Sequence, residues 1–128
     1  MTGIMQMLIS GQGGSSAANF IGTLIDSSYG NATAKNIATD TSGNVYVCGY
    51  VDFTSSGGVI DTYLAKYNSS GTLLWQEKLH SSATASQGLS IVLGTDGGVI
   101  AAGYLGTGSA VFVCKCSTSG GIQWQNYL

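Results

Sequence analysis

Residues 38–79 of the chain are ATDTSGNVYVCGYVDFTSSGGVIDTYLAKYNSSGTLLWQEKL, and most of this stretch recurs as residues 93–128, LGTDGGVIAAGYLGTGSAVFVCKCSTSGGIQWQNYL. The matched residues are Gly43, Val45, Gly49 and Tyr50 with Gly97, Val99, Gly103 and Tyr104, 54 residues apart, and Lys66, Ser70, Gly71 and Trp75 with Lys115, Ser119, Gly120 and Trp124, 49 residues apart. The change of offset is one deletion, opposite the Ser- and Gly-rich segment 50–63. The chain therefore contains a duplicated unit with one loop of variable length.

The composition predicts one modest domain with a single core, because the chain has only 128 residues. Apolar residues make up 44% of it and charged residues 8%, against roughly 25% charged in an ordinary soluble domain. The net charge is −2, and the chain contains no Arg. Nucleic acid and anionic membranes are therefore not expected partners, since both require a basic surface. No basic residue precedes Lys35, so a secretory signal is not expected.

Each copy of the unit predicts four short strands joined by hairpins. Asp or Asn beside Gly marks the turns between them, because these residues accept a positive φ at low cost. The expected strands are 36–38, 45–50, 63–67 and 73–79 in the first copy, and 90–92, 99–104, 112–116 and 122–128 in the second. Only 32–37 offers a weak helical alternative. Four short strands about every fifty residues is the spacing of a propeller blade, so the expected class is all-β.

The N-terminal part lies outside the repeat. Residues 1–18 are interpreted as an arm, in which Met5, Met7, Leu8 and Ile9 could form a short strand or pack on a neighbour. Residues 19–25, NFIGTLI, resemble the last strand of each copy in composition and in their place before a unit, with Phe20 or Ile21 at the position of the tryptophan. They predict an extra strand ahead of two blades, placed at about 34–79 and 88–128, in a unit that spans 19–128.

The repeated unit resembles the bacterial β-propeller repeat SBBP. The residues that carry the likeness are IATDTSGNVYVCGY and DTYLAKYNSSGTLLWQ in the first copy. In the second copy Gly94, Gly98 and Ala110 replace Asp40, Asn44 and Asp61. The likeness covers about 37–128, and more loosely begins at residue 20. It implies a propeller blade, and it implies a scaffold role, since such repeats occur in bacterial surface and extracellular proteins and in phage structural proteins.

Two blades alone predict an oligomer. Propellers close with roughly four to eight blades, and about three or more repeats are needed to bury their faces. Head-to-tail contacts that close give a ring. A trimer with six blades is favoured, and a tetramer or pentamer stays open. The extra strand could cross to the outer edge of a neighbour and cover it. A third interpretation is that the chain is a fragment of a longer repeat protein.

The sequence predicts no enzyme, no metal and no cofactor. A Ser–His–Asp site would need His80, which lies in a loop between the two copies, and a solvated loop histidine is the expected state. Cys48, Cys114 and Cys116 alternate with apolar residues between the copies, so each is expected to be a small buried hydrophobe. A zinc site would need four suitably spaced ligands, and the chain has one His.

The candidate ligand or interface residues are Trp75, Trp124, Tyr50, Tyr104 and Phe20. The two tryptophans recur in register and are expected to pack on the outer strand of each blade. The alternative is a lectin that assembles as a trimer of two-blade chains, as in fucose-binding lectins whose aromatic rings stack on sugars between blades. This chain lacks the Arg that those sites use and has a single Glu.

The resulting hypothesis is a non-enzymatic structural protein of a bacteriophage virion, in a tail, a fibre or a capsid-associated position. Its expected partners are further copies of itself, other virion proteins through residues 1–18, and host-surface glycans. The expected location is the virion, with an extracellular or cell-surface location as the alternative. The alternative function is the carbohydrate-binding lectin.

Overall fold

A computed structural model of the chain describes residues 6–9, 20–23, 31–52, 60–79, 85–106 and 110–128. These residues form ten strands and no helix, so none of them forms a helix able to cross a membrane. The strands are β1 (Gln6–Ile9), β2 (Phe20–Thr23), β3 (Asn31–Thr39), β4 (Val45–Asp52), β5 (Ile60–Tyr67), β6 (Leu73–Leu79), β7 (Ser86–Leu93), β8 (Val99–Leu105), β9 (Ala110–Cys116) and β10 (Ile122–Tyr127).

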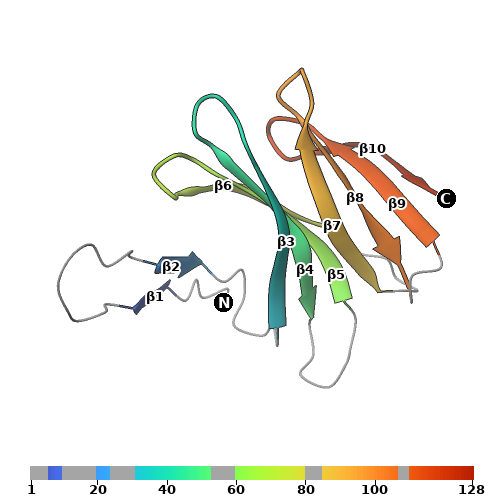
Figure 1. Cartoon of the computed structure of the whole chain (residues 1–128), viewed down its shortest axis with the longest axis horizontal. Helices are drawn as coiled ribbons and strands as arrows, with labels where there is room; N and C mark the ends of the chain where they lie inside the picture. Colours follow the sequence, from blue (N-terminus) through green and yellow to red (C-terminus); the bar gives the residue numbers. More distant parts are fainter. Residues whose placement is uncertain (1–5, 10–19, 24–30, 53–59, 80–84, 107–109) are drawn as a thin grey trace.

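Eight of these strands form two antiparallel sheets of four, each in chain order (Figure 1). The first sheet has the order β3-β4-β5-β6 and the second has β7-β8-β9-β10. The two sheets also share their irregularities, because the first strand of each contains a bulge, at Lys35 in β3 and at Leu89 in β7. The sequence duplication is therefore a structural duplication, in which each copy builds one complete sheet.

Four hairpin turns have the same geometry. In each, the N–H of the first turn residue donates to the carbonyl four residues later, and a glycine N–H donates back to the carbonyl of the first residue. The glycines have positive φ values of 77° to 96°, which L-residues with a side chain rarely adopt. They are Gly43, Gly71, Gly97 and Gly120. Glycine at these positions allows strands to follow one another with turns of minimal length.

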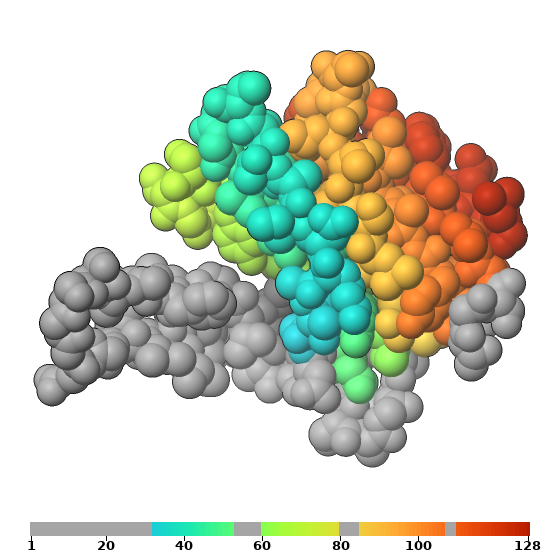
Figure 2. All heavy atoms as spheres, viewed as in Figure 1, coloured from blue at the N-terminus to red at the C-terminus, as the bar shows by residue number. Residues whose placement is uncertain are grey.

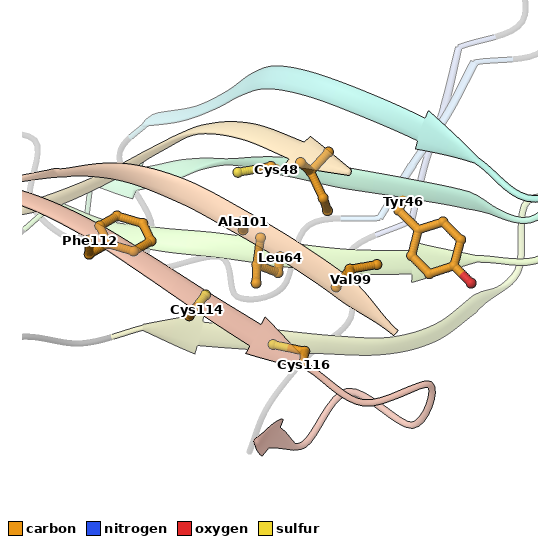
Figure 3. Close-up of a cluster of buried hydrophobic side chains, with 9 residues drawn as sticks. Tyr46, Cys48, Leu64, Val99, Ala101, Phe112, Cys114 and Cys116 are labelled. Carbon is orange, nitrogen blue, oxygen red and sulfur yellow. The ribbon is translucent and has the colours of Figure 1, made fainter. Parts of the chain in front are cut away.

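The main core lies between the two sheets, which pack face to face with β3 beside β7 (Figure 2). Side chains from both sheets meet there (Figure 3). The cluster consists of Tyr46, Cys48 and Leu64 from the first sheet, and Ile91, Val99, Ala101, Phe112, Cys114 and Cys116 from the second. All three cysteines are buried and free, which confirms their prediction as small hydrophobes. Burial of this apolar surface holds the two sheets together.

The expected strands agree best where turns bound them. Strand β6 has the predicted limits, whereas the first strand of each sheet was predicted too short. β3 begins at Asn31 instead of residue 36, and the weak helical alternative at 32–37 is wrong. The reason is that backbone pairing with β4 continues through polar residues, so no hydrophobic alternation marks the start of the strand.

The N-terminal strands pair with each other. β1 and β2 form a two-stranded antiparallel sheet with Gln6 opposite Thr23 and Ile9 opposite Phe20. β1 falls within the predicted short strand, and β2 falls within the predicted extra strand at 19–25. The role of 19–25 as an additional propeller strand stays a prediction. Apart from β1, the predicted arm at 1–18 lies outside the described residues, as does His80.

Candidate functional site

The side chain of Trp75 connects the outer strand of the first sheet to a turn of the second. Its indole Nε1–H donates a hydrogen bond of 2.9 Å to the carbonyl of Thr118. The ring covers Gly120 so closely that a Cβ added there would meet ring atoms at 2.9 to 3.1 Å. The edge of the ring faces Tyr46, with the centroids 6.3 Å apart. Trp75 therefore packs as expected from the sequence, and the 117–121 turn forms its seat.

A cross-strand row positions this tryptophan. Tyr46 on β4, Lys66 on β5 and Trp75 on β6 are register partners. The ammonium of Lys66 lies 5.0 Å from the centre of the Tyr46 ring. The second sheet repeats the row as Ile100, Lys115 and Trp124, again in register.

The first residues of β7 hold the junction at its other end. The Ser86 hydroxyl accepts a hydrogen bond of 2.9 Å from the N–H of Thr62 and donates one of 2.9 Å to the carbonyl of Leu79. Two residues later, a Cβ at Gly88 would meet the Cys48 sulfur at 2.6 Å and the Gly49 carbonyl at 2.9 Å. A side chain at residue 88 would therefore push the sheets apart.

A cavity of about 270 Å³ opens between the sheets beside this contact. It is lined by Lys78, Leu79, Ser86, Leu105, Phe112, Ile122, Gln125 and Tyr127. The ammonium of Lys78 also lies 3.7 Å from the buried carboxylate of Asp61. The volume is just below the usual range of small-molecule sites, roughly 300–1,000 Å³, so it suits a ligand of about one sugar ring. Polar and aromatic groups share its wall.

The turn carboxylates accept hydrogen bonds from backbone N–H groups of their own turns. Asp40 accepts hydrogen bonds from the N–H groups of Ser42 and Asn44, from the Asn44 side chain and from the Tyr46 hydroxyl. The Asn44 side-chain bond is the largest cause that lowers the pKa of Asp40. These bonds stabilise the ionised carboxylate within the turn itself.

In the second sheet, a carboxylate at a different position of the turn makes the equivalent backbone hydrogen bond. Asp96 stands two positions beyond Gly94, the counterpart of Asp40, yet it accepts from the N–H of Gly98, the counterpart of Asn44. Its other oxygen lies 2.6 Å from the Lys115 ammonium, and this contact chiefly lowers the pKa of Asp96. The two carboxylates therefore stand at different positions of the repeat and make an equivalent backbone hydrogen bond.

The remaining aromatic candidates make separate contacts. Lys35 lies 5.4 Å from the centre of the Tyr50 ring, and the Tyr104 hydroxyl donates 2.6 Å to the Gln87 side chain. The backbone of Phe20 belongs to β2, and its side chain lies outside the described residues. The structure therefore does not unite the predicted set of aromatic residues into one site.

Trp124 occupies the position of Trp75 in its own sheet but is 42% exposed. It lies on the face of the second sheet that points away from the first, since the register of β10 places it opposite Lys115.

The sequence did not indicate the cavity-lining residues Lys78, Gln125 and Tyr127. Lys78 and Tyr127 occupy the same position of the repeat but differ in residue type, so the duplication did not indicate this position as part of a site.

The buried thiols differ in acidity, because a hydrogen bond with Cys116 lowers the pKa of Cys114, whereas the pKa values of Cys48 and Cys116 are raised. Burial raises the pKa of Cys48 to about 11, an effect offset in part by a hydrogen bond from the Ser90 backbone. The hydrogen bond with Cys114 and burial raise the pKa of Cys116. A nucleophilic cysteine needs a lowered pKa, which allows the thiolate to form near neutral pH. Cys48 is protonated at neutral pH and acts as packing.

Comparison with known proteins identifies the repeat. Residues 22–51 match the family model of SBBP, a β-propeller repeat. The matched range includes β3 and nearly all of β4, the two strands that begin the first sheet. The match includes the IATDTSGNVYVCGY stretch, so the resemblance inferred from the sequence is confirmed for this part of the first copy. A search of curated proteins found no match.

Proposed function

We propose that this chain, which carries an SBBP β-propeller repeat, is a non-enzymatic structural protein that builds a propeller from several copies of itself. The observation that carries the proposal is the pair of apolar faces left uncovered on the outer sides of the two sheets. Ile37 on the first sheet is 62% exposed, and Trp124 on the second is 42% exposed. Large apolar side chains exposed on the outer faces of both sheets are consistent with an interface.

The low charge supports the same function. Only 8% of the residues are charged, so little electrostatic repulsion opposes the packing of copies against one another. Three copies would supply six blades, within the usual range of closed propellers. A trimer is therefore the favoured assembly, and four or five copies are the alternatives.

Native mass spectrometry tests the assembly directly. A closed trimer has a mass of about 39 kDa, against 13.0 kDa for one chain. A stable folded monomer contradicts the proposal. A ladder of masses without a preferred size contradicts closure and favours a fragment of a longer repeat protein.

The proposed setting of this propeller is the virion of a bacteriophage, in a tail, a fibre or a capsid-associated position. The support is the family likeness, because SBBP-type repeats serve as scaffolds. The exposed apolar side chains and the low charge described above also support this setting. Antibodies raised against the recombinant chain should label purified phage particles in immunogold electron microscopy. Labelling of bacterial cell surfaces, with unlabelled particles, would replace the virion by the cell surface.

A second candidate function is carbohydrate binding, which the cavity between the sheets favours. Its wall combines the Tyr127 ring with the Gln125 amide and the Lys78 ammonium, groups that suit the faces and hydroxyls of a sugar. A glycan array with the wild-type chain tests this candidate. Binding that Gln125→Ala abolishes, while circular dichroism stays unchanged, supports a lectin; an empty array removes it.

A further inference from the structure

The outer faces of the molecule repeat the two faces that meet inside it. The head face is defined as the outer side of the first sheet, with Ile37, Val45, Val47, Tyr63, Tyr67 and Gly71. Their counterparts in the second sheet form its inner face. The tail face is defined as the outer side of the second sheet, with Ile100, Ala102, Val113, Trp124 and Leu128. Its counterparts form the inner face of the first sheet.

Burial differs sharply between these counterparts although their positions in the sheets are the same. Ile91 is 3% exposed inside the junction, and Ile37 is 62% exposed on the head face. Leu79 packs against the core, and its counterpart Leu128 is 86% exposed. Among the described residues, the head and tail faces therefore lack the neighbouring sheet that covers their counterparts at the junction.

The turn that seats Trp75 has a vacant twin. Residues 117–121 and 68–72 share the same two backbone hydrogen bonds, and their glycines have φ values of 96° and 81°. At Gly120 an added Cβ would meet the Trp75 ring, whereas at Gly71 it would meet nothing within 4 Å. The seat around Gly71 is thus preformed and open.

We propose that Trp124 of one copy docks on the 68–72 turn of a second copy. Its ring covers Gly71, and its indole N–H donates to the carbonyl of Ser69, the counterpart of Thr118. This contact rests on the proposed oligomeric propeller and specifies how one copy meets the next. The head face of each copy receives the tail face of another, which is a heterologous contact able to close into a ring.

The sizes of the side chains favour a second copy over an unrelated partner. Tail-face residues are smaller than their inner twins, with Ile100, Ala102 and Val113 in place of Tyr46, Cys48 and Leu64. The head face is larger at two positions, with Tyr67 in place of Cys116 and Val47 in place of Ala101. Bulk lost from one outer face returns on the other, as close packing between the two requires.

The polar groups of the head face also suit burial. The hydroxyls of Tyr63 and Tyr67 lie 3.4 Å apart, so one donates to the other. This hydrogen bond would remain when a neighbouring copy buries the two hydroxyls. Burial already raises the pKa of Tyr63, which keeps this phenol neutral at physiological pH.

Two single substitutions, one on each face, test the contact by native mass spectrometry. Trp124→Ala removes the docking ring, and Gly71→Asn fills its seat with a residue that tolerates a positive φ. Each variant is expected to lose the wild-type oligomer and to appear as a folded monomer. Tyr127→Ala is the control for Trp124, since Tyr127 is also exposed on β10 but lines the cavity. Gly97→Asn, in a turn of the same conformation, is the control for Gly71. Both control variants are expected to form an oligomer with the same number of chains as the wild type.

Mixing the two variants distinguishes the proposed contact from every symmetric one. The intact tail of Gly71→Asn fits the intact head of Trp124→Ala, so an equimolar mixture is expected to form a dimer and nothing larger. Monomers alone in the mixture overturn the contact, provided that circular dichroism shows both variants folded. A wild-type oligomer that both variants retain also overturns it while leaving the proposed propeller intact. A monomeric wild type instead rejects the proposed function itself.

Discussion

The hydroxyl of Ser86 accepts a hydrogen bond of 2.9 Å from the backbone N–H of Thr62, across the junction between the two sheets. Both residues are almost fully buried, and the same hydroxyl donates to the carbonyl of Leu79. A single oxygen thus ties the first residue of β7 to two strands of the first sheet. Buried backbone groups need such partners, because an unpaired one costs about 1–3 kcal/mol.

Ser86→Ala is therefore expected to destabilise the chain by about 1–3 kcal/mol, because the Thr62 N–H and the Leu79 carbonyl each lose a partner. Urea unfolding followed by circular dichroism measures the change. Ser70→Ala is the control, since Ser70 is exposed in a turn and takes part there through its backbone N–H. Equal midpoints for the two variants would show that the Ser86 bridge contributes nothing.

The turn carboxylates predict a rescue experiment. Asp40→Gly copies the glycine of the second sheet and removes four hydrogen bonds, so the melting temperature should fall by about 5 °C. Adding Ser42→Asp places a carboxylate where Asp96 stands in the other turn. The double variant should recover part of the loss, because Asp96 reaches the equivalent N–H from that position. A double variant no more stable than Asp40→Gly would contradict this exchange of positions.

Alkaline pH should weaken the fold through Cys48. Its pKa is about 11 in the folded chain, above the ordinary value of 9.0. The folded state therefore keeps a proton that the unfolded chain releases, so stability is full below the ordinary pKa and falls as pH rises through the folded pKa. From about pH 8 to about pH 10 the loss should be about 1 kcal/mol. Cys48→Ala, the residue found at 102, should lose less stability over the same interval in urea titrations; an identical loss in both chains would exclude Cys48 as the cause.

The two seats should respond differently to a methyl group. In Gly120→Ala, both the positive φ and the contact of the new methyl group with the Trp75 ring lower the stability. In Gly71→Ala, only the positive φ lowers the stability of an isolated chain. In a Trp124→Ala background, which lacks the outer contact, Gly120→Ala should be less stable than Gly71→Ala by at least about 1 kcal/mol. Denaturant titration of the two double variants gives the difference. Equal stabilities would mean that the ring moves aside freely.

Much of the fold could be predicted from the duplication. Turns with Gly43, Gly71, Gly97 and Gly120 separate the strands, and they set the limits of β6 correctly. The start of β3 could not be predicted, because its polar residues pair through the backbone alone. The hydroxyls of Tyr63 and Tyr67 lie 3.4 Å apart, so these two side chains share one face of β5.

The candidate site was only partly predictable, for a reason seen in Trp75 and Trp124. The two residues occupy one position of the repeat and share the flanking sequence WQ. One is seated on Gly120 and the other is exposed, because only the first sheet has a neighbour on that side. A local pattern records which face a residue points to, but not whether that face is covered. The cavity depends on Ser86, Gln125 and Phe112, which come from three strands and share no sequence pattern.

The difference between the head and tail faces has a genetic consequence. A subunit that lacks Trp124 keeps an intact Gly71 seat, so a normal subunit can still bind it. In the proposed ring, such a subunit would be incorporated at random and would leave one junction open. With equal amounts of the two alleles, only about one trimer in eight would contain normal subunits alone. Loss of this one exposed side chain should therefore behave as a dominant mutation, whereas loss of the partly buried Trp75, which acts within its own chain, should be recessive.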